Sequence, residues 1–136
     1  MTIFDRTMRL LERTLDLRSG RQRVIASNLA NEETPGYRAS ELTFMDQLQS
    51  AHKGRLPIVL AATQPRHFGL KGAEGVQAVT GKLNEVPAGD IPLDANSVNL
   101  ELEMAKLSEN VMQYNAAATI LAKKFSGLLS AIREGR

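Results

Sequence analysis

Cysteine and tryptophan are absent from the 136-residue chain, and no apolar run approaches the length of a membrane-spanning helix. Without cysteine, the chain can form neither a disulfide framework nor a thiolate metal site. Because a spanning helix needs about 20 mostly apolar residues, the sequence predicts no membrane span. Asp5 and Arg6 directly follow Ile3 and Phe4, so no signal-peptide pattern is present there. If the chain is exported, we expect a route that reads no cleavable signal.

Aromatic residues are also scarce. The four phenylalanines and two tyrosines make up 4% of the sequence and are scattered along it. A compact core of ordinary size is difficult to build from so few large side chains, and the length allows one domain at most. The net charge of +2 is small, and the basic residues do not cluster with aromatic ones. These features argue against a nucleic-acid partner.

Residue patterns typical of active sites are missing as well. His52 and His67 have no second histidine or carboxylate at metal-ligand spacing. The glycines at 69, 72 and 75 lack the Lys-Ser/Thr of a phosphate-binding loop, and no serine lies in a nucleophile motif. Glu32 and Glu33 are better explained as charged residues that solvate the end of the helix than as a catalytic pair. We therefore predict that the chain is not an enzyme and uses no cofactor or metal.

The C-terminal third has the most regular pattern, a heptad seam that predicts one long helix from Leu100 to Ile132. Asn96, Ser97 and Asn99 are N-cap candidates at its start. At 1.5 Å per residue the helix would span roughly 50 Å. The seam consists of Leu100, Met104, Leu107, Val111, Tyr114, Ala118, Leu121, Phe125, Leu128 and Ile132.

The N-terminal third predicts a second, less regular helix. Its apolar residues start with the same spacing, and the pattern is interrupted at Ser19–Gly20, where glycine is unfavourable in a helix by about 1 kcal/mol. Either the helix bends there, or a different face is buried on each side. The first part of the seam comprises Phe4, Met8, Leu11 and Leu15, and a parallel row comprises Leu10, Leu17 and Val24. The arginines of this helix suit pairing with carboxylates of neighbouring chains, or else form a solvated face.

Most glycines and prolines lie in the middle of the chain, where order is predicted to fade. Pro57–Leu60 and Gly75–Val79 are the candidate short strands. An interval without acidic residues, between Asp46 and Glu74, fits a solvated loop better than a stretch that meets an acidic partner surface or the anionic cell wall. The predicted fold is mainly α, with two long terminal helices in a coiled-coil-like hairpin and a small, partly β or irregular middle. Its segments are 1–38, 39–95 and 96–136.

The C-terminal seam has a consequence for assembly. Each large apolar side chain gains roughly 1.5–3 kcal/mol when fully buried. One interrupted helix and a glycine-rich middle cannot cover a stripe of this length. The seam and the Phe4–Leu15 residues are therefore predicted to form an assembly interface, and the chain to be a subunit.

The first helix ends in an unusual way, in the stretch “ASNLANEETPGYR” (26–38). Asparagines are poor helix formers, because their amides compete for backbone groups. Pro-Gly suits the central positions of a type II turn. The stretch resembles the N-terminal signature of the bacterial flagellar rod and hook proteins, the axial family, in which a long helix ends in this way. The matching residues are Asn28, Leu29, Ala30, Asn31, Thr34, Pro35, Gly36 and Tyr37.

Within that family the chain is most similar to the short subunits of the proximal rod. “YRASELTF” (37–44) and the C-terminal helix, with Lys-Lys-Phe-Ser at 123–126, carry the likeness. The resemblance implies a structural protein of the flagellar basal body, located in the periplasmic rod and needed for motility. Its terminal helices would self-assemble into a hollow tube that transmits torque and passes exported subunits.

The resemblance also implies partners: copies of the chain, other rod proteins, proteins of the membrane-ring junction, and the type III export apparatus that delivers unfolded subunits. The Asn28–Tyr37 segment would then form a rigid bend in which the asparagine amides satisfy open backbone groups. The alternative is a small soluble coiled-coil adaptor or secretion chaperone, which should persist as a folded dimer. Such a protein has no reason to carry the signature.

Overall fold

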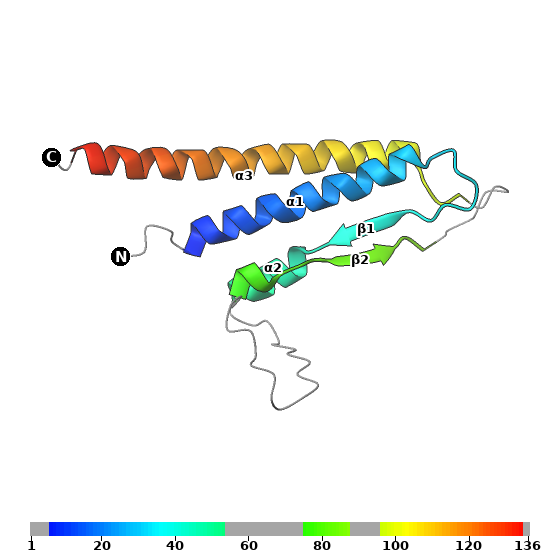
Figure 1. Cartoon of the computed structure of the whole chain (residues 1–136), viewed down its shortest axis with the longest axis horizontal. Coiled ribbons are helices and arrows are strands. Elements are labelled where there is room, and N and C mark those ends of the chain that lie inside the picture. Colours follow the sequence, from blue (N-terminus) through cyan, green and yellow to red (C-terminus); the bar gives the residue numbers. More distant parts are fainter. Residues whose placement is uncertain (1–5, 54–74, 88–95, 135–136) are drawn as a thin grey trace, which may run out of the picture.

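The computed structural model describes residues 6–53, 75–87 and 96–134. Three layers lie side by side in Figure 1: the long helix α3, the central helix α1, and a layer of short elements on the far side of α1. The chain is mainly helical, as predicted. The elements in order are α1 (Arg6–Ala30), β1 (Ser40–Thr43), α2 (Met45–His52), the 3₁₀ helix η1 (Gly75–Ala78), β2 (Lys82–Glu85) and α3 (Leu100–Glu134).

α3 confirms the helix predicted from the seam and is 35 residues long. Asn99 caps its start, since its side-chain Oδ1 accepts a hydrogen bond from the Leu102 N–H at 3.0 Å. Glu101 and Glu103 lie in the first turn and Arg133 in the last, which is the favourable polarity for the helix dipole. None of the helices in the described ranges is long and apolar enough to cross a membrane.

α1 runs through Ser19–Gly20 as one continuous helix of 25 residues. α1 has a neighbour on two sides. Leu17 packs into the short-element layer, whereas the Arg18 carbonyl is contacted by α3. Gly20 permits the close approach of β1, since a Cβ there would lie 3.3 Å from Cδ2 of Leu42.

The small core lies between α1 and the short elements, and Phe44 is the aromatic side chain in it. Leu10 and Leu42 pack against its edge. β1 and β2 pair antiparallel from Ser40↔Glu85 to Thr43↔Lys82, and packing on α1 supports a pair that would be marginal alone. The buried core residues are Leu17, Phe44, Leu48, Ala51, Val76 and Val79.

The prediction of a strand at Gly75–Val79 is wrong, because this segment begins with the 3₁₀ helix η1. Val76 and Val79 are both buried, and a spacing of three places them on one face of a 3₁₀ helix but on opposite faces of a strand. The strand follows instead, as β2. The other predicted strand, Pro57–Leu60, lies outside the described residues, as does Phe4 of the seam.

Arginines of α1 attach the short elements to the helix. The Arg13 Nε donates to the Val79 carbonyl at 2.6 Å, and Arg21 pairs with Glu41 at 3.1 Å. Arg6 donates to the carbonyl of His52. These three side chains therefore bind within their own chain, which neither interpretation of the arginines had foreseen.

Replacing Gly20 with valine should lower the free energy of unfolding by about 1–3 kcal/mol, because the new side chain would displace Leu42. The matched control is Gly127→Val, at a helical glycine of α3 with no atom within 4 Å of an added Cβ. The free energy of unfolding of this control should rise slightly, since valine is a better helix former than glycine. Urea unfolding measures both, and equal effects would contradict the close approach.

Candidate functional site

The end of α1 has the turn that the sequence predicts. The Tyr37 N–H donates to the Thr34 carbonyl at 3.2 Å, and Gly36 has a φ of +73°, as the third position of a type II turn requires. Asn31 closes the last helical turn by donating from Nδ2 to the Ser27 carbonyl at 2.8 Å. Its Oδ1 accepts from the Thr34 hydroxyl at 3.2 Å.

Asn28 is fully buried, at 0% exposure, where α1, β1 and α3 meet. Its Nδ2 donates to the Ser40 carbonyl at 2.8 Å and to Oε2 of Glu103 at 2.9 Å. Its Oδ1 accepts from the Ser40 N–H at 3.0 Å and from the Tyr37 hydroxyl at 3.4 Å. One side chain thus satisfies backbone groups at the start of β1 and a side chain of α3.

Glu103 is a buried carboxylate, only 2% exposed. Its second oxygen, Oε1, accepts from the Lys106 Nζ at 2.9 Å. Burying a charge is unfavourable unless it is paired and hydrogen-bonded. Asn28 and Lys106 together meet that requirement.

Asn96, just before α3, holds the turn that follows α1. It is 5% exposed, and its Nδ2 lies 3.0, 2.6 and 2.8 Å from the carbonyl oxygens of Asn31, Glu32 and Thr34. Its Oδ1 accepts from the Val98 N–H at 2.8 Å. The next residue, Ser97, accepts from the Ala39 N–H at 2.8 Å. The start of α3 is thereby fixed to the end of α1.

Asn110 makes a third polar contact between the long helices. It is 1% exposed, and its Nδ2 donates to the Arg18 carbonyl at 2.9 Å. Arg18 is itself 5% exposed, with its guanidinium 5.6 Å from the centre of the Phe44 ring. Burial lowers the pKa of Arg18 and nearby Arg21 lowers it further, while Glu109 opposes them. Arg18 Nη1 and Asn110 Oδ1 are buried without a hydrogen-bond partner among the described residues.

What we call the polar row comprises Asn96, in the segment just before α3, and Glu103 and Asn110 on one side of α3, each seven positions from the next in sequence. The apolar seam did not reveal it. The available signal was the same heptad spacing of three polar residues beside the seam.

The structure divides the residues of the predicted assembly interface into a group that is buried or partly buried and a group that is exposed. Met8 is buried, and Leu11 and Leu15 are partly buried. In α3, partial burial is seen at Leu107, Tyr114, Ala118, Leu121 and Leu128. What we call the exposed row comprises Leu100, Met104, Val111, Phe125 and Ile132, each from 37% to 67% exposed.

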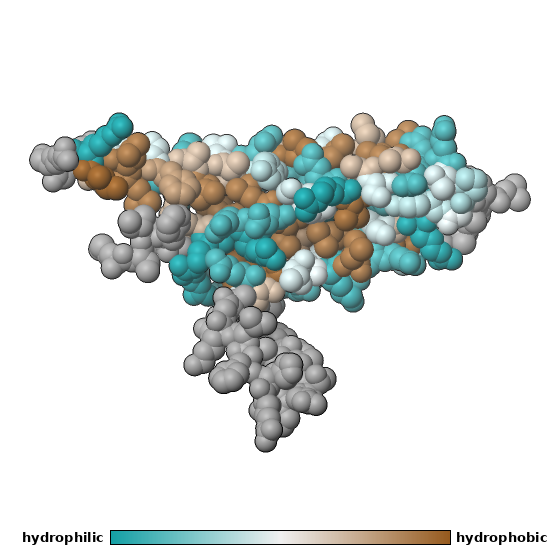
Figure 2. Space-filling model, in the orientation of Figure 1, coloured by the Kyte–Doolittle hydropathy of each residue, from teal (hydrophilic) through white to brown (hydrophobic). Residues whose placement is uncertain are grey.

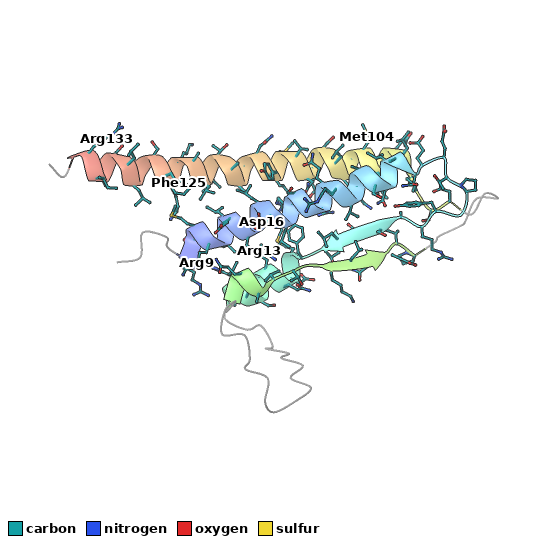
Figure 3. The ribbon with its side chains drawn as sticks, viewed as in Figure 1. Arg9, Arg13, Asp16, Met104, Phe125 and Arg133 are labelled. Carbon is teal, nitrogen blue, oxygen red and sulfur yellow. The ribbon has the colours of Figure 1, made fainter. Side chains whose placement is uncertain are left out.

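Figure 2 shows apolar surface along much of α3. Figure 3 marks Met104 near the start of α3 and Phe125 toward its end. The exposed row therefore extends along most of the helix.

Comparison with known proteins now bears on the function. The family model for flagella basal body rod protein matches residues 8–38, which contain α1 from Met8 onward and the turn after it. Flagellar basal body rod protein FlgB of Yersinia ruckeri is 31% identical over 137 residues, covering 96% of each chain. The chain belongs to the FlgB family of flagellar basal body rod proteins. FlgB of Cereibacter sphaeroides is 31% identical over 98% of each chain, and FlgB of Escherichia coli K12 is 28% identical over 96% of each.

Membership of the FlgB family confirms the resemblance found in the signature. The chain is a structural subunit of the flagellar basal body rod and not an enzyme. The match also favours the rod subunit over the adaptor or chaperone. Motility follows as the process that it serves.

Replacing Asn28 with alanine should reduce the free energy of unfolding by about 2–3 kcal/mol, because the Ser40 backbone groups and the buried Glu103 lose a partner. Asn115→Ala, at an exposed site of α3, should change it by less than about 0.5 kcal/mol. Urea unfolding of both variants measures the difference. A loss no larger at Asn28 than at Asn115 would show that the junction is not needed.

Proposed function

We propose that the chain is a subunit of the proximal rod and assembles through its terminal helices into a hollow axial tube. The exposed row of α3 carries this proposal. Within the described residues, α1 is the long helix beside α3, and it leaves Leu100, Met104, Val111, Phe125 and Ile132 between 37% and 67% exposed. Apolar side chains repeated along a helix gain free energy when a neighbouring helix covers them.

The proposal assigns two roles to α3. Its polar row and the partly buried seam residues pack against α1 of the same chain, in a hairpin of coiled-coil character. Its exposed row packs against neighbouring subunits. The segments 1–38 and 96–136, which contain the terminal helices, would then build the inner tube.

A tube of this kind would transmit torque and let later subunits pass through its lumen. We further propose the periplasm as its location and the flagellar export apparatus as its route. Copies of the chain, other rod proteins and the proteins of the membrane-ring junction are the proposed partners.

Met104→Asp should prevent incorporation into basal bodies and abolish motility, because it places a charge in the exposed row. Since Met104 is 50% exposed, the isolated chain should keep its helix content and stability. Swimming in soft agar, immunoblots of purified basal bodies and circular dichroism of the purified variant test this.

The matched control is Met112→Asp, the same change at a methionine of α3 that is 72% exposed and outside the row. It should incorporate and support swimming. Normal motility of Met104→Asp would overturn the proposed interface. Equal loss in both variants would show that the contact is not specific to this row.

A further inference from the structure

The apolar contacts between α1 and α3 do not by themselves define one alignment of the two helices. Seam residues recur every heptad, so sliding α3 by one heptad puts Tyr114 where Leu107 was and Leu121 where Tyr114 was. Such slips preserve most apolar burial, as in coiled coils, where a buried polar residue is often what selects one register.

We infer that the polar row sets the register of α3 on α1 by an alternating order of donors and acceptors. Asn96 donates to carbonyl oxygens of the turn after α1. Glu103 accepts from the Asn28 amide. Asn110 donates again, to the Arg18 carbonyl. The order along α3 is therefore donor, acceptor, donor.

This order makes a slip unfavourable in either direction. If α3 moved by one heptad toward the turn after α1, Glu103 would lose the Asn28 amide, and its carboxylate would move toward the carbonyl oxygens of Asn31, Glu32 and Thr34. If it moved the other way, the carboxylate would replace the Asn110 amide beside the Arg18 carbonyl. An ionised carboxylate only accepts hydrogen bonds. In both slips buried oxygen would face buried oxygen, without a proton between them.

The same chemistry selects the partner of α3. The α1 of a neighbouring subunit could offer an equal apolar surface, but it would satisfy the polar row only in full native register and with its own turn in place. The row thus directs one side of α3 to an α1 in native register and leaves the exposed row for other contacts. This inference concerns pairing within the chain and holds whether or not the exposed row is the assembly interface.

Glu103→Gln is the decisive variant. A glutamine has the same length, and its single amide oxygen can still accept from Asn28 while Lys106 loses its partner, so the native register stays available. Its amide hydrogens can also donate to the carbonyl oxygens that it meets after a slip. The variant removes the penalty on slipped registers while retaining the contact with Asn28.

Distances between two spin labels report the register directly, and the absence of native cysteine makes labelling simple. Ala26→Cys and Lys123→Cys place labels at exposed sites of α1 and α3. Pulsed electron–electron resonance on the unaltered row should give one distance. Glu103→Gln should add populations displaced by about 10 Å, one heptad of helix rise. Dilution with unlabelled chain separates pairs within a chain from pairs between chains.

Glu101→Gln is the matched control, since it removes an exposed carboxylate from the same turn of α3. It should keep the single distance. Asn110→Leu, which removes one donor while Arg18 retains its helical hydrogen bond, should raise the slipped fraction about fivefold, as expected for one hydrogen bond. A single native distance in both Glu103→Gln and Asn110→Leu would overturn the inference, as would equal heterogeneity in Glu101→Gln.

Discussion

The buried hydrogen bond between Asn28 and Glu103 is the contact on which the rest of the structure depends. It joins the last turn of α1 to the first turn of α3, and through the same amide it fixes the start of β1. With neither partner exposed by more than 2%, water cannot replace a lost partner. Removal of one side chain would therefore affect three elements at once.

The small size of the apolar core follows from the composition of the chain. With few aromatic residues, the chain builds one cluster around Phe44 and relies on polar contacts elsewhere. Arg13 and Arg21 hold the short elements on one side of α1, and the polar row holds α3 on the other. Polar contacts are directional, so they specify an arrangement that a small apolar core would leave loose. α1 becomes the central element because it has contacts on both sides.

Some of this could be predicted from the sequence. The seam from Leu100 to Ile132 predicts α3, and Thr34-Pro35-Gly36-Tyr37 predicts the turn, because both patterns follow from local geometry. The signature also indicates the family. The pairing of Ser40 with Glu85 was not predictable, since β1 and β2 lie far apart and carry little alternation. The partner of Asn28 was not predictable either, because nothing near it in sequence points to Glu103.

The contacts that align the two long helices join residues separated by 62 to 92 positions in the chain. Closing so long a loop is entropically unfavourable and is usually completed late in folding. Contacts between α1 and β1 span far fewer positions, as between Asn28 and Ser40, so they can form first. Loop-closure entropy therefore favours formation of α1 and its turn before α3 is aligned on them.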